Sequence, residues 1–185
     1  MRALIAAADG CEEIETLSTY DFLKRAGIEV CLASIKNENY VEAAHGLKFI
    51  TDTTLAKEFE ENFDVIVLPG GLPGSVNLQK CEILISMLKR QQKEGRWIAA
   101  ICAAPGFVLG SNNLIGTAKY TGYPGTCNQV TTGTFIDQGI CVDVDHKLIT
   151  AQGPAFATAF ALTIVTNLCG QEIMEKVAKD ALVSH

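Results

Sequence analysis

The chain has 185 residues, of which 48% are hydrophobic and 19% are charged, and its formal net charge is -6. This length and composition are those of a globular protein, and we expect one domain over residues 1–185. An acidic chain lacks the basic surface that nucleic-acid phosphates or anionic membranes attract, so we expect neither as a partner.

The first half of the chain alternates between strand-like and helix-like segments. Residues 12–27 have Ile14, Leu17 and Tyr20 at helical spacing, and we expect these side chains to face a sheet. Residues 39–54 alternate in polarity and predict a small hairpin at the sheet edge. Short apolar runs predict buried strands at 2–8, 28–35 and 64–71.

The second half continues the alternation. Residues 96–110 predict a strand, an abrupt turn and a short helix. Helices are expected at 82–95, 154–170 and 172–183, and shorter β segments at 119–121, 134–142 and 147–151. The predicted fold is α/β, a flavodoxin-like, doubly wound and mostly parallel sheet with helices on both faces. No signal peptide or span of ~20 apolar residues is evident, so we expect a cytoplasmic protein.

The cysteines do not form a disulfide or zinc pattern. Their number is odd, they are scattered along the chain, and no Cys-x-x-Cys occurs. We therefore expect no metal site and mostly buried, unreactive thiols. The seven cysteines are Cys11, Cys31, Cys81, Cys102, Cys127, Cys141 and Cys169.

Cys102 is the exception, because it stands where a buried strand must turn into a helix. Small residues on both sides permit a tight, strained turn of the kind that exposes a nucleophile. A helix N-terminus favours a thiolate, and the following backbone N–H groups could hold an oxyanion. The alternative is a cysteine that is simply packed in the core.

Two further features end neighbouring strands. Gly70 and Gly71 allow the backbone to approach a ligand, although a glycine pair is also common in ordinary turns. Glu15 lies in the first turn of the first helix, where a desolvated carboxyl could stay protonated and donate a hydrogen bond to a thiolate. The alternative for Glu15 is a solvated helix start that complements the helix dipole.

The sequence offers no obvious base beside Cys102. The three histidines are His45, His146 and His185, and none adjoins the cysteine in sequence. A cysteine–histidine protease arrangement is therefore not predicted. No glycine-rich phosphate-binding motif occurs, so we expect no nucleotide cofactor.

Several motifs together resemble the ThiJ/PfpI superfamily, specifically the branch of the Parkinson's-disease protein DJ-one and its bacterial relatives. The resemblance covers nearly the whole chain. It is carried by EEIET (12–16), RAGIEV (25–30), DVIVLPGG (64–71), AAICAAP (99–105) and TAQGP (150–154), in that order.

The resemblance implies a homodimer that needs no cofactor and acts on small reactive aldehydes. Cys102 would be a low-pKa nucleophile, Glu15 its protonated partner, and Gly70, Gly71 and Ala103 the backbone donors. The implied activity is glyoxalase III, which converts methylglyoxal to lactate, or deglycation of protein and nucleotide adducts. The implied alternative is a non-catalytic sensor of oxidative stress, or a chaperone, that works through oxidation of Cys102.

The chain departs from the family at the rim of this site. Tyr123 stands where many members have a histidine, His45 where an arginine is usual, and Gln152 where animal members have an arginine. Ala103 replaces the histidine that follows the thiol in the protease-like branch. Tyr123, His45 and Pro154 are our candidates for the substrate pocket.

Overall fold

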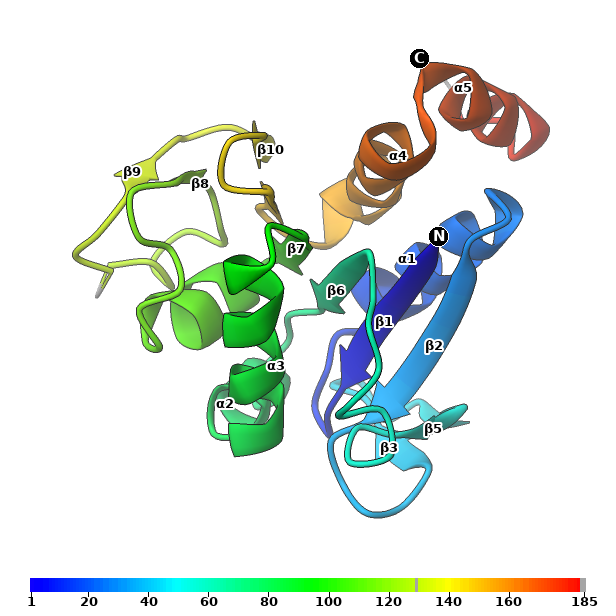
Figure 1. Ribbon diagram of the computed structural model, residues 1–185. Helices are drawn as coiled ribbons and strands as arrows, with labels where there is room; N and C mark the ends of the chain where they lie inside the picture. The colour runs from blue at the N-terminus through cyan, green and yellow to red at the C-terminus, as the bar shows by residue number, and fades with distance from the viewer. Residues whose placement is uncertain (129, 184–185) are drawn as a thin grey trace.

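The computed structural model describes residues 1–128 and 130–183 and contains a seven-stranded sheet in the order β10-β11-β7-β6-β1-β2-β5 (Figure 1). Only β10 runs antiparallel to its neighbour among these strands, so the predicted mostly parallel α/β sheet is confirmed. The strands are β1 (Arg2–Ala7), β2 (Glu29–Ser34), β5 (Thr53–Thr54), β6 (Val65–Leu68), β7 (Trp97–Ile101), β10 (Ile140–Asp143) and β11 (Leu148–Ala151).

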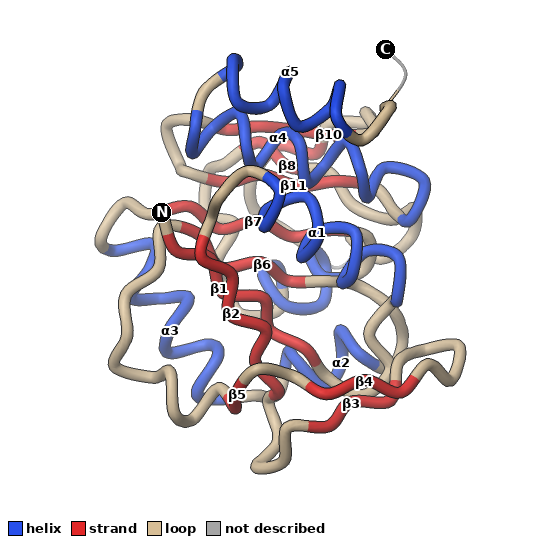
Figure 2. The backbone as a smooth tube through the Cα atoms, turned by 90° about the vertical axis from the view of Figure 1, so that its right-hand side faces the viewer, coloured by secondary structure: helices blue, strands red, loops and turns tan. Residues whose placement is uncertain are grey.

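Helices cover both faces of the sheet, and alternate residues of β1 divide between the two cores. Ala3 and Ile5 pack in the core beneath α1 and α4, whereas Leu4 and Ala6 pack in the core beneath α3. Figure 2 shows α1 and α3 on opposite sides of the sheet. The helices are α1 (Glu13–Arg25), α2 (Gly74–Gln79), α3 (Glu82–Lys93), the π-helical η1 (Pro105–Gly110), the 3-10 turn η2 (Pro154–Phe156), α4 (Ala157–Cys169) and α5 (Gln171–Asp180).

The buried face of α1 differs from the prediction. Ile14 is 53% exposed, and Leu17 and Tyr20 are only half-buried. The helix instead buries a largely polar face that includes Thr16 and Thr19. Each threonine hydroxyl donates to the backbone carbonyl four residues earlier, at 2.8 and 2.7 Å. Because these hydroxyls are satisfied within the helix, the threonines can be buried at little cost.

The predicted hairpin exists, but it is shorter than expected. Strands β3 (Tyr40–Glu42) and β4 (Lys48–Ile50) form a separate two-stranded sheet, while β5 pairs with β2 at the edge of the main sheet. The hairpin is tied to the loop after β1, because the N–H of Gly10 donates to the carbonyl of Glu42 at 2.8 Å. A second small sheet consists of β8 (Lys119–Tyr120) and β9 (Thr134–Phe135).

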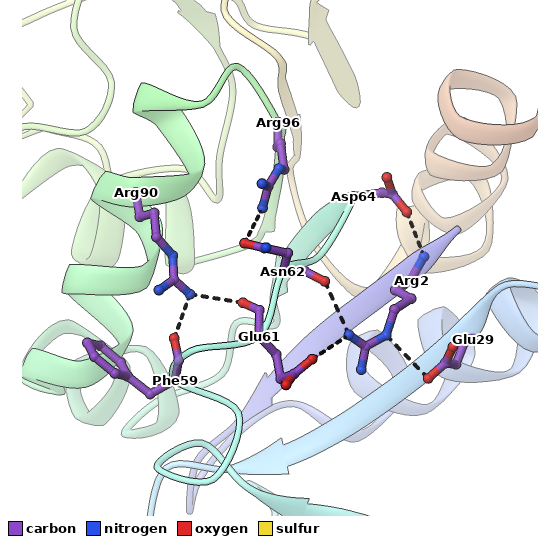
Figure 3. A network of polar contacts seen from close by, with 8 residues as sticks. All are labelled: Arg2, Glu29, Phe59, Glu61, Asn62, Asp64, Arg90 and Arg96. Carbon is purple, nitrogen blue, oxygen red and sulfur yellow. Dashed lines mark hydrogen bonds and ion pairs between the residues drawn. The ribbon is translucent and has the colours of Figure 1, made fainter.

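Charged side chains fix the opposite end of the sheet, where the strands begin (Figure 3). The Arg2 guanidinium pairs with Glu29 at 3.3 Å and with Glu61 at 2.9 Å. Arg90 of α3 donates to the backbone carbonyls of Phe59 and Glu61. These contacts hold the connection between β5 and β6 against both β1 and α3. Because the side chains are largely exposed, each ion pair contributes only ~0–1 kcal/mol.

Candidate active site

Three adjacent strands deliver the candidate residues to one edge of the sheet. Strand β6 lies between β1 and β7, so the segments that follow these strands meet at their carboxyl ends. Glu15 follows β1, Gly70 and Gly71 follow β6, and Cys102 follows β7 directly. This edge is where doubly wound folds place their ligands.

Cys102 occupies the sharp turn that its sequence neighbours predict. Its φ is 62°, a left-handed conformation that is unusual for a residue with a side chain. The turn is held on both sides, because the Cys102 N–H donates to the carbonyl of Ala151 at 2.9 Å and the Cys102 carbonyl accepts from the N–H of Tyr123 at 2.7 Å. The residue is 8% exposed, so it is largely buried but keeps a small contact with solvent.

Glu15 is a fully buried acid, with an exposed fraction of 0%. Its Oε2 accepts a hydrogen bond from the N–H of Gly70 at 2.7 Å. Its Oε1 is buried and has no hydrogen-bond partner within the described residues. Burial raises the pKa of Glu15 to about 7, while the Gly70 N–H acts in the opposite direction. The alternative of a solvated helix start is therefore wrong for this residue.

Gly70 is required where Glu15 and Cys102 approach each other. A Cβ added to Gly70 would lie 2.5 Å from the Cβ of Cys102 and 2.7 Å from Oε2 of Glu15. Gly71 has a φ of 84°, and a Cβ there would lie 2.5 Å from the backbone nitrogen of Glu12. The two glycines thus let three strand ends pack closely enough for the acid to reach the thiol.

The prediction of a lowered thiol pKa is wrong for the structure. Burial is the main cause that raises the pKa of Cys102 to about 12, and the charge of Glu15 raises it further. The N–H groups of Gly71 and Ala103 lower this pKa, but by less. Sequence reasoning weighed the helix end and the backbone donors, whereas the desolvation of the thiol depends on tertiary packing.

Two of the three predicted pocket residues lie together. Tyr123 and Pro154 line a cavity of about 220 Å³ with Gln152 and Phe156. The ring of Tyr123 packs over Gly153, where an added Cβ would lie 3.3 Å from the ring. Tyr123 is also bonded to Cys102 through the backbone, so this cavity adjoins the thiol-bearing turn.

His45, the third predicted pocket residue, is exposed and held by Glu13. Its Nδ1 lies 2.7 Å from Oε2 of Glu13, and its backbone N–H donates to Oε1 of the same carboxylate at 2.6 Å. This contact raises the pKa of His45. His146 contacts Asp143 instead, and His185 lies outside the described residues.

The carboxylates beside His45 are engaged in holding the backbone. Glu12, Glu13 and His45 each place a ligand atom within 4.8 Å of the others, which is a spacing that a metal ion could use. Glu12, however, caps α1 by accepting from the N–H of Glu15 at 2.8 Å, and Glu13 holds the hairpin. These hydrogen bonds explain the cluster without an ion.

Comparison with known proteins gives a consistent result. The sequence model of the DJ-1/PfpI family matches residues 1–167. Protein DJ-1 homolog A of Arabidopsis thaliana is 37% identical to this chain, and the match covers 97% of the chain. The same match covers only 46% of that longer protein. The glutathione-independent glyoxalase DJR-1.2 of Caenorhabditis elegans is 33% identical over 95% of this chain and 92% of its own length.

The fold comparison agrees. The structure of oxidized Toxoplasma gondii DJ-1 superimposes with a TM-score of 0.95 at 33% identity, covering 100% of this chain and 99% of that one. Within the described part of the chain, no helix combines the length and apolar character needed to cross a membrane.

Proposed function

Because the chain belongs to the DJ-1/PfpI family, we propose that it converts small 2-oxoaldehydes such as methylglyoxal to hydroxy acids through Cys102. The same chemistry would serve for the adducts that these aldehydes form with amines. The proposal rests above all on the fully buried carboxyl of Glu15, which lies close enough to Cys102 for a hydrogen bond between the two side chains to affect its pKa. A relative that carries the name of a glyoxalase supports the choice of substrate.

The reactive state that we propose has the proton on Glu15 and the negative charge on Cys102. A pKa of about 7 keeps Glu15 partly protonated at neutral pH. Protonation of Glu15 removes the second-largest cause that raises the pKa of Cys102, after burial, and supplies a donor to the sulfur. Glu15 and Cys102 thus titrate as a coupled pair, in which the charge of one side chain affects the pKa of the other.

The thiolate adds to the aldehyde carbon and forms the S–C bond, and Glu15 gives its proton to the oxygen to yield a hemithioacetal. The N–H groups of Gly71 and Ala103 stabilise the negative oxygen during this step. The Glu15 carboxylate then removes the proton from the former aldehyde carbon, and the neighbouring carbonyl oxygen takes up a proton, which gives an enediol. Return of the proton from Glu15 to the neighbouring carbon, with loss of the hydroxyl proton from the sulfur-bearing carbon, leaves the lactoyl thioester. Water hydrolyses the thioester to lactate and the free thiol, so the sequence needs no external oxidant or metal.

The direct test is the formation of lactate from methylglyoxal by the purified protein. We expect activity in the wild type and its loss in Cys102→Ser. Cys141→Ser is the matched control, because Cys141 is also 8% exposed and belongs to β10. Equal lactate production by wild type and Cys102→Ser would exclude the proposed enzyme.

A second candidate function is sensing of oxidants through Cys102. It is favoured by the oxidized state in which the Toxoplasma gondii relative was described, and Cys102 is not fully buried, with an exposed fraction of 8%. N–H donors and a protonated Glu15 would also hold the oxygens of a sulfinate. Addition of two oxygens to Cys102 by peroxide, together with negligible lactate formation, would favour this function over the enzyme.

We further propose that two copies of the chain associate through α1 and the adjoining hairpin. Ile14, Leu47 and Ile50 are 53%, 44% and 80% exposed, and all three are apolar. The hairpin is fixed to α1 by the contact of His45 with Glu13, so these side chains belong to one region of the surface. Such a region, next to the candidate site, suits a two-fold interface.

A further inference from the structure

A second cavity, of about 450 Å³, shares Tyr123 and Gln152 with the first among its lining residues. We call it the aromatic cavity and define it by Tyr120, Tyr123, Phe135, Asp137 and Gln152, which lie among its lining residues. The rings of Tyr123 and Phe135 are 49% and 44% exposed, so their faces are available to a ligand. Phe135 is held in place by Tyr120, whose ring packs edge-on at 5.6 Å.

The charge of the aromatic cavity has one sign. Among the described residues that line it, Asp137 is the only one with a charged side chain at neutral pH, and no lysine, arginine or histidine accompanies it. The amide of Gln152 donates to Oδ1 of Asp137 at 3.0 Å and so holds the carboxylate at the cavity. A carboxylate in a cavity that is also lined by aromatic rings disfavours anions and attracts cations, because the faces of aromatic rings are also negative.

We propose that the aromatic cavity binds an organic cation of the guanidinium or ammonium class. The planar guanidinium fits this site best, since it can stack on a ring and donate to a carboxylate at the same time. A neutral ligand of the same shape would keep the stacking but lose the ionic contact with Asp137.

The aromatic cavity is joined to the reactive turn by two short connections. The N–H of Tyr123 donates to the carbonyl of Cys102, and Gln152 directly follows Ala151, whose carbonyl accepts from the N–H of Cys102. The aromatic cavity therefore adjoins the backbone of the turn that carries Cys102.

The binding test uses N-acetylarginine amide and its neutral isostere N-acetylcitrulline amide, compared by titration calorimetry or ligand-observed NMR. We expect the arginine compound to bind the wild type roughly tenfold more tightly. Asp137→Asn should remove most of this difference, whereas Asp145→Asn, a change at another exposed aspartate, should preserve it. Tyr123→Leu keeps Asp137 but removes one ring face, and should weaken binding of both compounds.

Equal binding of the two compounds by the wild type, or an unchanged difference in a folded Asp137→Asn variant, would overturn the inference. Cys102→Ser should bind the arginine compound like the wild type. The wild type separates the two proposals, because absent lactate formation by the wild type together with intact cation binding would reject only the enzyme. Lactate formation without discrimination between the two compounds would reject only the cation site.

Discussion

The backbone N–H of Gly70 donates a 2.7 Å hydrogen bond to Oε2 of Glu15, and this bond holds a fully buried carboxyl next to the thiol of Cys102. The bond uses one oxygen and leaves Oε1 without a partner among the described residues. A buried polar atom without a partner is costly, and such atoms concentrate where a protein does chemistry. The account of function given above follows from this pair of residues.

Burial of Glu15 should make the stability of the protein depend on pH. Its pKa rises from 4.5 to about 7 on folding, so the folded state binds this proton more tightly than the unfolded chain. The resulting stabilisation is fully present below pH 4.5 and is lost as the pH rises through about 7, a total of about 3 kcal/mol. Urea unfolding of the wild type and of Glu15→Gln at pH 4.5 and pH 8 measures this loss of stability as a change in the free energy of unfolding.

In Glu15→Gln this group no longer titrates. The free energy of unfolding should therefore fall less between the two pH values in the variant than in the wild type. The same pH dependence in both proteins would mean that Glu15 is ionised throughout, and the proposed sharing of a proton with Cys102 would be wrong.

Gly70→Ala should reduce the activity of the protein far more than it reduces its stability. The new methyl group would press on Cys102 and Glu15, and overpacking of this kind costs about 1–3 kcal/mol. We expect lactate formation to fall at least a hundredfold, on the order of the loss when reacting groups are misplaced by 1 Å. Gly95→Ala, at the open end of α3, is the control and should cost about 1 kcal/mol without loss of activity. A fully active Gly70→Ala variant would contradict the close approach described here.

Local sequence patterns predict much of the fold. The apolar runs of β1, β6 and β7 are read directly from the sequence, because strands that are buried on both faces tolerate few polar residues. The turn at Cys102 is equally local, since small neighbours and Pro105 leave little choice of conformation. Helix α2 (Gly74–Gln79) was not predicted, because six residues are too few for a helical period to be recognised.

Features that depend on distant contacts could not be predicted in this way. The inward face of α1 is polar because Thr16 and Thr19 satisfy their own hydroxyls, which an apolar spacing rule does not register. The raised pKa of Cys102 depends on how closely its surroundings exclude water. The aromatic cavity combines Tyr123 with Asp137, which come from different parts of a long connection and have no common motif.

Ile14→Glu should dissociate the proposed dimer. The substitution places a charge in the centre of the exposed apolar region on α1, where burial against a second copy would leave it unpaired. Light scattering after size exclusion should give the mass of a dimer for the wild type and of a monomer for the variant. Ile83→Glu on α3, where Ile83 is 36% exposed, serves as the control and should remain dimeric. A monomeric wild type would refute this interface.

Peroxide should oxidise Cys102 before the other cysteines if Glu15 and the backbone donors stabilise the oxidised sulfur. Cys11 is fully buried, whereas Cys102 is 8% exposed, so peroxide should reach Cys11 less readily. Peptide mass spectrometry should find two added oxygens on Cys102 in the wild type and less of this product in Glu15→Gln. Uniform oxidation of several cysteines would argue against an activated thiol.

The central claim is that Cys102 carries the substrate and that Glu15 moves its proton. Rapid-quench mass spectrometry after addition of methylglyoxal tests both roles at once in the wild type, Glu15→Gln and Cys102→Ser. We predict that the wild type releases lactate, that Glu15→Gln retains a methylglyoxal adduct on Cys102 without releasing lactate, and that Cys102→Ser does neither. Turnover by Glu15→Gln at the wild-type rate, or an adduct confined to cysteines other than Cys102, would contradict the account.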